Sequence, residues 1–94
     1  MNYYKRLWDE TTGEELTDSW GTSTFYFETD NEHNVIRQLQ IFQNGNALKY
    51  WDKFKEDKYG FVSDQPLDKE EFASYKIDKD EFERTWTKTQ KTFE

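Results

Sequence analysis

Residues 35–51 constrain the fold more than any other part of this sequence. They contain Asn44-Gly45, two residue types that tolerate the positive φ angles of a tight type I′ turn. On either side of this dipeptide lies a run in which apolar and polar residues alternate. The sequence therefore predicts a β-hairpin with Asn44 and Gly45 as its two-residue loop.

The length of this loop sets the register of the hairpin. Counting outward from a two-residue loop pairs Ile41 with Leu48 and Leu39 with Tyr50. Because side chains alternate between the two faces of a strand, we expect these four residues together on the core face. The other side chains of the hairpin would lie on the outer face: Gln38, Gln40, Phe42, Lys49 and Trp51.

Residues 22–29 form a neighbouring predicted strand, because this run is rich in β-branched and aromatic residues. If the strand pairs with the hairpin across the polar loop 30–34, Tyr26 and Glu28 join the outer face. The hairpin register also places Arg37 opposite Asp52, so we expect an ion pair between these two side chains.

Three other segments complete the predicted first part of the chain. Residues 3–8 have an alternating pattern with aromatic residues at both ends, which predicts a first strand. Residues 59–63 are expected to form a short last strand. Residues 9–21 are acidic and contain two glycines, which predicts a surface loop. We expect Trp20 of this loop to pack back onto the body of the protein.

After Pro66 the pattern becomes that of helices. Residues 67–72 and 77–82 are near copies, in which Asp68 and Asp78 have the position of an N-cap with Glu three residues later. The second helix is expected to run from Lys79 toward Lys91. Residues 1–94 are therefore predicted to form a single α+β domain, an antiparallel sheet of about four to five strands with two C-terminal helices packed on one face.

The charge balance restricts the classes of partner. The chain has 20 acidic and 13 basic residues, which gives a net charge of −7. Such a surface repels nucleic acid and anionic membranes and attracts basic protein surfaces, although in a small domain the same charge also serves solubility. The sequence has no cysteine and no apolar run of the length of a signal peptide or a membrane span, so we expect a cytoplasmic protein.

The sequence contains no motif typical of catalysis or of cofactor binding. His33 is the single histidine, and a metal site would need several further ligands converging on it. No serine lies in a Gly-x-Ser-x-Gly motif, and the glycines are isolated rather than grouped in a phosphate-binding loop. We therefore expect a protein that is not an enzyme and that holds no cofactor or metal.

The outer face of the sheet is the candidate binding surface. Tyr26, Gln38 and Trp51 are expected in one row across it, and aromatic anchors in a polar surround are typical of binding hot spots. The alternative is that the N-terminal segment or the tail with Phe93 covers this face, so that its aromatic residues form a second core. The complete predicted partner-binding set is Tyr26, Glu28, Gln38, Gln40, Phe42, Lys49, Trp51 and Asp52.

Several segments of the chain occur together in a distinctive order: residues 3–8, 25–30, 35–42 with the Asn44-Gly45 turn, 63–67 and 77–86. With these segments the chain resembles a family of small acidic bacterial proteins that look like immunity proteins of polymorphic or contact-dependent toxin systems. The resemblance implies a cytoplasmic protein, taken here as a monomer, that neutralises a basic toxin domain by occluding its active surface. It assigns no catalytic residues.

Two other functions remain open from the sequence. One is a phage-encoded or regulatory interaction module, in which the acidic surface imitates nucleic acid and captures a nucleic-acid-binding protein. The other is a small hydrolase, which would depend on His33 or on one specific carboxylate.

Overall fold

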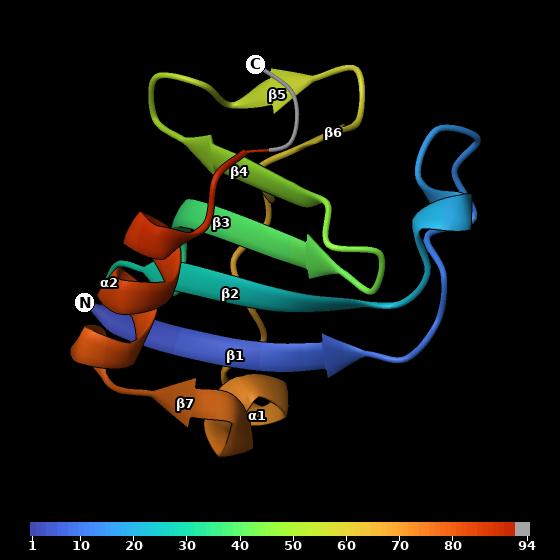
Figure 1. Cartoon of the computed structure of the whole chain (residues 1–94). Coiled ribbons are helices and arrows are strands. Elements are labelled where there is room, and N and C mark those ends of the chain that lie inside the picture. Colours follow the sequence, from blue (N-terminus) through green and yellow to red (C-terminus); the bar gives the residue numbers. More distant parts are fainter. Residues whose placement is uncertain (92–94) are drawn as a thin grey trace.

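The computed structural model describes residues 1–91, and its main element is an antiparallel sheet of five strands in the order β4-β3-β2-β1-β7 (Figure 1). Its strands are β1 (Asn2–Trp8), β2 (Ser23–Thr29), β3 (Val35–Phe42), β4 (Ala47–Trp51) and β7 (Lys76–Ile77). A separate two-stranded ladder joins β5 (Glu56–Asp57) to β6 (Gly60–Phe61), and β6 lies within the predicted last strand. The helical elements are η1 (Asp18–Trp20), α1 (Lys69–Phe72), η2 (Ala73–Tyr75) and α2 (Lys79–Lys88). The predicted α+β class is confirmed.

The two helices pack against opposite faces of the sheet, whereas we expected both on the same face. Adjacent residues of a strand point to opposite faces, and Tyr3 and Tyr4 of β1 do so. The ring of Tyr3 lies 5.3 Å from that of Phe82 in α2, and the ring of Tyr4 lies 5.8 Å from that of Phe72 in α1. Figure 1 shows α2 in front of the sheet and the connection from β6 to α1 behind it. We call these faces the α2 face and the groove face.

Each face has its own hydrophobic core. The core of the α2 face consists of Tyr3, Tyr26, Leu39, Ala47 and Phe82, with Ile41, Ile77 and Trp86 packed against it. The groove face has two clusters, one of Trp20, Phe42, Leu48 and Tyr50 and one of Tyr4, Phe27 and Phe72. Large aromatic rings thus supply most of the buried surface in a chain with few aliphatic residues.

Both predicted helix starts are confirmed. The Asp68 carboxylate accepts hydrogen bonds from the backbone N–H groups of Glu70 and Glu71, and the Asp78 carboxylate accepts one from Glu81 N–H. These bonds satisfy donors that have no partner within the helix. The N–H of Thr89 closes α2 by bonding to the Thr85 carbonyl, so the helix ends at Lys88 instead of continuing toward Lys91.

The loop of the central hairpin has three residues, so the predicted register of β3 and β4 is wrong by one residue. Phe42 N–H bonds to the Asn46 carbonyl at 2.8 Å, and Gly45 N–H bonds to the Phe42 carbonyl at 2.9 Å. Gly45 has a φ of +93°, whereas Asn44 does not adopt a positive φ. This is a type I turn completed by a left-handed glycine, an alternative that suits the same dipeptide.

A β-bulge between β2 and β3 produces a second shift of one residue. Thr29 pairs with Val35 as predicted, but Glu28 pairs with Arg37, so Ile36 is the additional residue in β3. Because of the bulge and the longer loop, Leu39 lies opposite Tyr26 on one side and Lys49 on the other. The expected core set therefore separates: Leu39 and Ile41 lie on the α2 face, and Leu48 and Tyr50 lie on the groove face.

Candidate functional site

The predicted partner-binding residues do not share one face. Tyr26, Glu28, Lys49 and Trp51 belong to the α2 face, and Gln38, Gln40 and Phe42 belong to the groove face, as the strand pairing requires. Asp52 lies in the exposed turn after β4. The predicted row of Tyr26, Gln38 and Trp51 is therefore wrong, because each one-residue shift moves a strand's side chains to the opposite face.

The helix α2 covers the α2 face, so its aromatic residues mostly form a core. Tyr26 is 8 % exposed, and Leu39 and Phe82 beside it are fully buried. The sequence left open whether another segment covers these aromatic residues. On this face they are covered, by α2 and not by the N-terminal segment. Phe93 lies outside the described residues.

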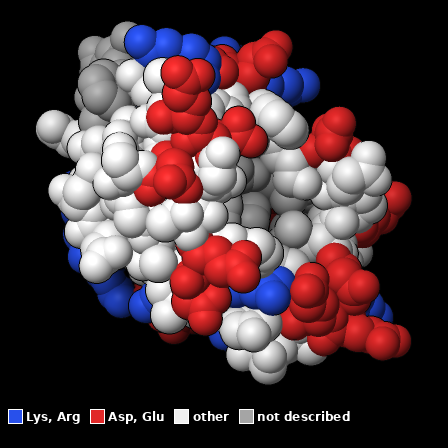
Figure 2. All heavy atoms as spheres, turned by 90° about the vertical axis from the view of Figure 1, so that its right-hand side faces the viewer, with Lys and Arg blue, Asp and Glu red and all other residues white. Residues whose placement is uncertain are grey.

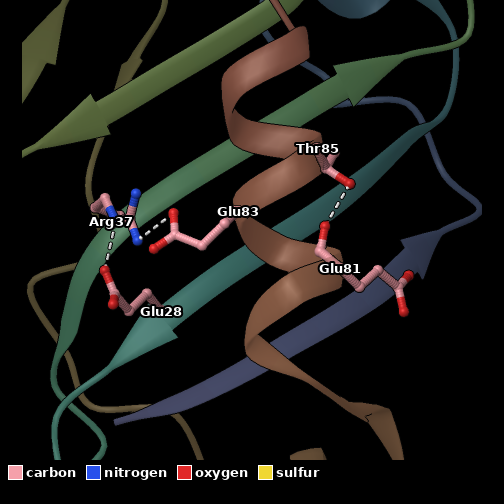
Figure 3. Close-up of polar contacts among 5 residues, drawn as sticks. All are labelled: Glu28, Arg37, Glu81, Glu83 and Thr85. Atoms are coloured by element: carbon pink, nitrogen blue, oxygen red, sulfur yellow. Dashed lines mark hydrogen bonds and ion pairs between the residues drawn. The ribbon is translucent and has the colours of Figure 1, made fainter.

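Arg37 is the electrostatic centre of the α2 face (Figure 3). Its guanidinium forms one ion pair with Glu28 of β2 and a second, at 2.9 Å, with Glu83 of α2. It also lies over the rings of Phe82 and Trp86, at 4.8 and 5.0 Å from their centroids. The predicted ion pair with Asp52 is wrong, because Arg37 pairs across the strands with Trp51. Arg37 therefore ties α2 to the sheet.

A hollow of about 290 Å³ lies on the α2 face. It is lined by three of the predicted binding residues, Lys49, Trp51 and Asp52, together with Arg37 and Trp86. The Lys49 ammonium lies 4.8 Å from the centre of the Trp86 ring, and Trp51 meets the same ring edge-on at 6.1 Å. Burial, together with repulsion from Arg37, lowers the pKa of Lys49. The hollow is small, and Arg37 is already paired with Glu28 and Glu83.

A groove of about 710 Å³ lies on the groove face. Strands β2, β3 and β4 form its floor, with Phe25, Phe27, Gln38, Gln40, Phe42, Leu48 and Tyr50. Its sides are formed by Arg6 and Trp8 of β1, by Thr12, Glu14 and Thr17 of the acidic loop 9–21, and by residues of the segment 57–67. Gln38, Gln40 and Phe42, all predicted from the sequence, thus lie together in the floor of one concave site.

The side chain of Gln38 attaches the segment 57–67 to the sheet. Its Nε2 donates to the Phe61 carbonyl at 3.2 Å, and its Oε1 accepts from Ser63 N–H at 2.9 Å. The amide therefore bonds to the segment as the backbone of a neighbouring strand would. This use of both polar groups explains why Gln38 is buried, because a buried amide without partners would cost several kcal/mol, roughly 2 to 7.

Asp57 fixes the other end of this segment. Its Oδ1 accepts hydrogen bonds from the Tyr50 hydroxyl at 2.8 Å, from Tyr59 N–H at 2.8 Å and from Gly60 N–H at 3.2 Å, and its Oδ2 lies 3.3 Å from the Lys91 ammonium. Burial alone would raise the pKa of Asp57, but these hydrogen bonds and Lys91 together hold the pKa below its ordinary value. Burial and Asp57 both raise the pKa of Tyr50, which stays protonated and donates.

Trp20 packs onto the body of the protein, as predicted, and thereby holds the acidic loop 9–21 beside the groove. Its ring meets Phe42 edge-on at 5.0 Å and lies 5.3 Å from the ring of Tyr59. Trp20 is 9 % exposed. Loop residues with Glu14 among them therefore have a defined position at the groove.

The rim of the groove combines exposed rings with carboxylates. Trp8 is 40 % exposed and Phe61 is 60 % exposed, although both are large apolar residues. Glu14 and Asp64 also line the groove and are exposed. Figure 2, which looks from the side of loop 9–21, shows Asp and Glu side chains on several sides of a hollow. Sequence reasoning missed these four residues, although the alternation of Tyr4, Arg6 and Trp8 already indicates a second face of β1.

Other kinds of site find little support in the part of the chain that the structure describes. No group of three or more His, Cys, Asp or Glu side chains among residues 1–91 could hold a metal ion. No helix in this range is long and apolar enough to cross a membrane. Comparisons with protein-family models, with curated proteins and with solved structures find no match to the chain.

Proposed function

We propose that this chain is a non-enzymatic binding protein, a cytoplasmic immunity protein that neutralises a bacterial toxin domain by covering its basic surface. The observation that carries the proposal is the groove, an open aromatic site with carboxylates at its rim on a protein of net charge −7. The resemblance to immunity proteins supplies the class of partner.

The exposed rings at the rim are the anchors in this proposal. Trp8 and Phe61 leave large apolar areas in contact with water, and burying such rings is the usual energetic centre of a protein interface. A stable complex buries roughly 800 Å² on each partner, so the interface would extend beyond the groove onto loop 9–21 and segment 57–67. The acidic surface would speed association with a basic partner, and the buried rings would slow dissociation.

The proposal is tested by expressing the chain together with the product of the toxin gene adjacent to its own. The expected result is that cells survive and that the two proteins purify as a complex. Replacing both anchors, with Trp8→Ala and Phe61→Ala, should weaken the complex by roughly 30-fold or more, as the loss of a hot spot does. Failure of the wild-type chain to rescue cells or to co-purify would contradict the proposal.

Leu7→Ala is the matched control. Leu7 adjoins Trp8 in β1 and is 66 % exposed, but its side chain belongs to the opposite face of the sheet because neighbours on a strand alternate. This variant should bind the toxin as well as the wild type does. Equal losses in Leu7→Ala and in the double variant would show that the groove is not the interface. Circular dichroism of all variants checks that the fold is retained.

A further inference from the structure

We infer that the groove recognises an arginine side chain of the partner, and that Gln40 accepts a hydrogen bond from its guanidinium. This inference rests on the proposed function, since it names the chemical group that enters the proposed interface. It begins from Gln40, a residue that is 8 % exposed. Its side chain lines the groove and donates from Nε2 to the Ser23 hydroxyl at 2.9 Å.

The carbonyl oxygen of the Gln40 side chain has no hydrogen-bond donor among residues 1–91. This oxygen is not fully buried, and Gln40 lines the groove, so we take it to be reachable from there. An acceptor on a residue that is more than nine-tenths buried is costly to leave unpaired. Gln40 therefore offers an acceptor to an N–H donor that enters the groove.

The charges around Gln40 favour a donor that is also a cation. Glu14 and Asp64 line the groove and form no ion pair with the described residues. Of the bases that line it, Arg6 is paired with Glu71 at 3.2 Å, which leaves Lys58 as the cation without a carboxylate in that range. The unpaired groups of the groove thus carry two negative charges and one positive charge.

The apolar surface of the groove fits a flat guanidinium better than an ammonium. Phe25 and Phe27 are stacked at 5.4 Å with 5° between their planes, and Trp8 meets Phe25 edge-on at 6.4 Å. Arginine stacks on such rings and has several donors in one plane, so it can contact Gln40 and a carboxylate together. Lysine has a compact, strongly hydrated charge and matches this arrangement less well.

A comparable environment already holds one guanidinium at the side of the groove, that of the chain's own Arg6. It lies 5.3 Å from the ring of Trp8, 5.1 Å from that of Phe72 and 5.1 Å from that of Tyr75, and it pairs with the Glu71 carboxylate. Rings with one carboxylate are therefore a sufficient environment for arginine on this face. A volume of about 710 Å³ leaves room for the arginine together with apolar neighbours from the same segment.

The test uses three synthetic peptides, Ac-Gly-Leu-X-Leu-Gly-NH2, in which X is arginine, lysine or citrulline. Citrulline has the shape of arginine without its charge. Each peptide is titrated into the whole protein labelled with ¹⁵N, and two-dimensional NMR follows the side-chain amides of Gln38 and Gln40 and the indole of Trp8. We expect the arginine peptide to shift these signals and to bind roughly tenfold more tightly than the citrulline peptide, as a charge-assisted hydrogen bond implies. The lysine peptide should lie between them.

Two pairs of variants localise the effect. Gln40→Met keeps the length of the side chain without its acceptor and should reduce the preference for arginine over citrulline, because only the attraction of Glu14 and Asp64 remains. Ser23→Ala removes only the partner of Nε2 and should keep the full preference. Asp64→Asn should weaken binding of the arginine peptide, and Glu10→Gln is its control, because Glu10 is an exposed acid that does not line the groove. The Asp64 pair decides the question if Gln40→Met does not fold.

Equal binding of the arginine and citrulline peptides, no binding of any peptide, or shifts confined to the α2 face would overturn the inference. These outcomes are separate from those of the toxin experiment. If no peptide binds selectively but the chain rescues cells and this rescue requires Trp8 and Phe61, the inference about arginine is wrong and the proposed function is still supported. Arginine-selective binding without rescue would contradict the proposed function alone.

Discussion

The contact between Tyr50 and Asp57 makes a quantitative prediction about how the groove is held together. Tyr50 is 1 % exposed, and its hydroxyl donates to Asp57 Oδ1 at 2.8 Å. Tyr50→Phe removes this donor while Asp57 keeps its other partners, so we expect a loss of about 1 to 2 kcal/mol in the free energy of unfolding. Asp57→Ala also leaves the buried hydroxyl and the N–H groups of Tyr59 and Gly60 without this acceptor, so we expect a loss of roughly 3 kcal/mol.

The double variant measures the contact itself. Once Asp57 is gone, removing the Tyr50 hydroxyl costs little, so the double variant should be about as stable as Asp57→Ala. The interaction energy should be about 1 to 2 kcal/mol in urea unfolding at pH 7, followed by tryptophan fluorescence. If the two losses add within about 0.5 kcal/mol, the two side chains are not coupled and the described arrangement of β5 and β6 is wrong.

The same pair predicts a dependence on pH. The pKa of Asp57 is lower in the folded protein than its ordinary value of 3.8, which is close to that of the unfolded chain. Its carboxylate therefore stabilises the fold fully above pH 3.8, and this contribution disappears as the pH falls through the lower, folded pKa. The difference in stability between the wild type and Asp57→Ala should thus be constant from pH 7 to 5 and should shrink in acid. A difference that grows in acid would contradict the assignment.

Three further predictions concern the rest of the fold. Phe82→Ala should lower the free energy of unfolding by roughly 3 to 5 kcal/mol, measured by urea denaturation, because Phe82 is fully buried between α2 and the sheet; an exposed control, Tyr75→Ala, should cost far less. Gly45→Ala should cost about 1 kcal/mol or more, since φ at this position is +93° and alanine is strained there, although nothing lies within 4 Å of an added Cβ; a stability equal to that of the wild type would argue for a different loop. Arg37→Ala should cost about 1 to 3 kcal/mol by leaving the buried Glu28 unpaired, whereas Asp52→Asn should have almost no effect; the reverse order would favour the register with Arg37 opposite Asp52.

The sequence predicts local structure well where one residue type has one suitable conformation. Asp68 and Asp78 cap their helices as expected, because an aspartate carboxylate at this position accepts hydrogen bonds from the free N–H groups of the first turn. The strands on either side of the Asn44-Gly45 turn are likewise in place.

The register was not predictable, because it depends on single residues whose alternatives differ little in energy. Asn44-Gly45 suits both a two-residue loop and the observed three-residue loop, and nothing in the sequence marks Ile36 as the bulge residue. Both faces of the sheet are also buried, so the alternation of apolar and polar residues does not distinguish them. Gln38 looked like a surface residue for this reason, although its amide bonds to residues 23 and 25 positions later in the chain.

The position of β1 has a consequence for the order in which the chain folds during synthesis. Tyr3 pairs with Glu28 on one side and with Ile77 on the other, so β1 leaves the ribosome well before its partner β7 has been synthesised. Strands β2, β3 and β4 follow one another through short loops and can assemble earlier. Until α2 emerges, Tyr26 and Leu39 remain uncovered, so a ribosome stalled before residue 79 would present an apolar sheet to chaperones and proteases.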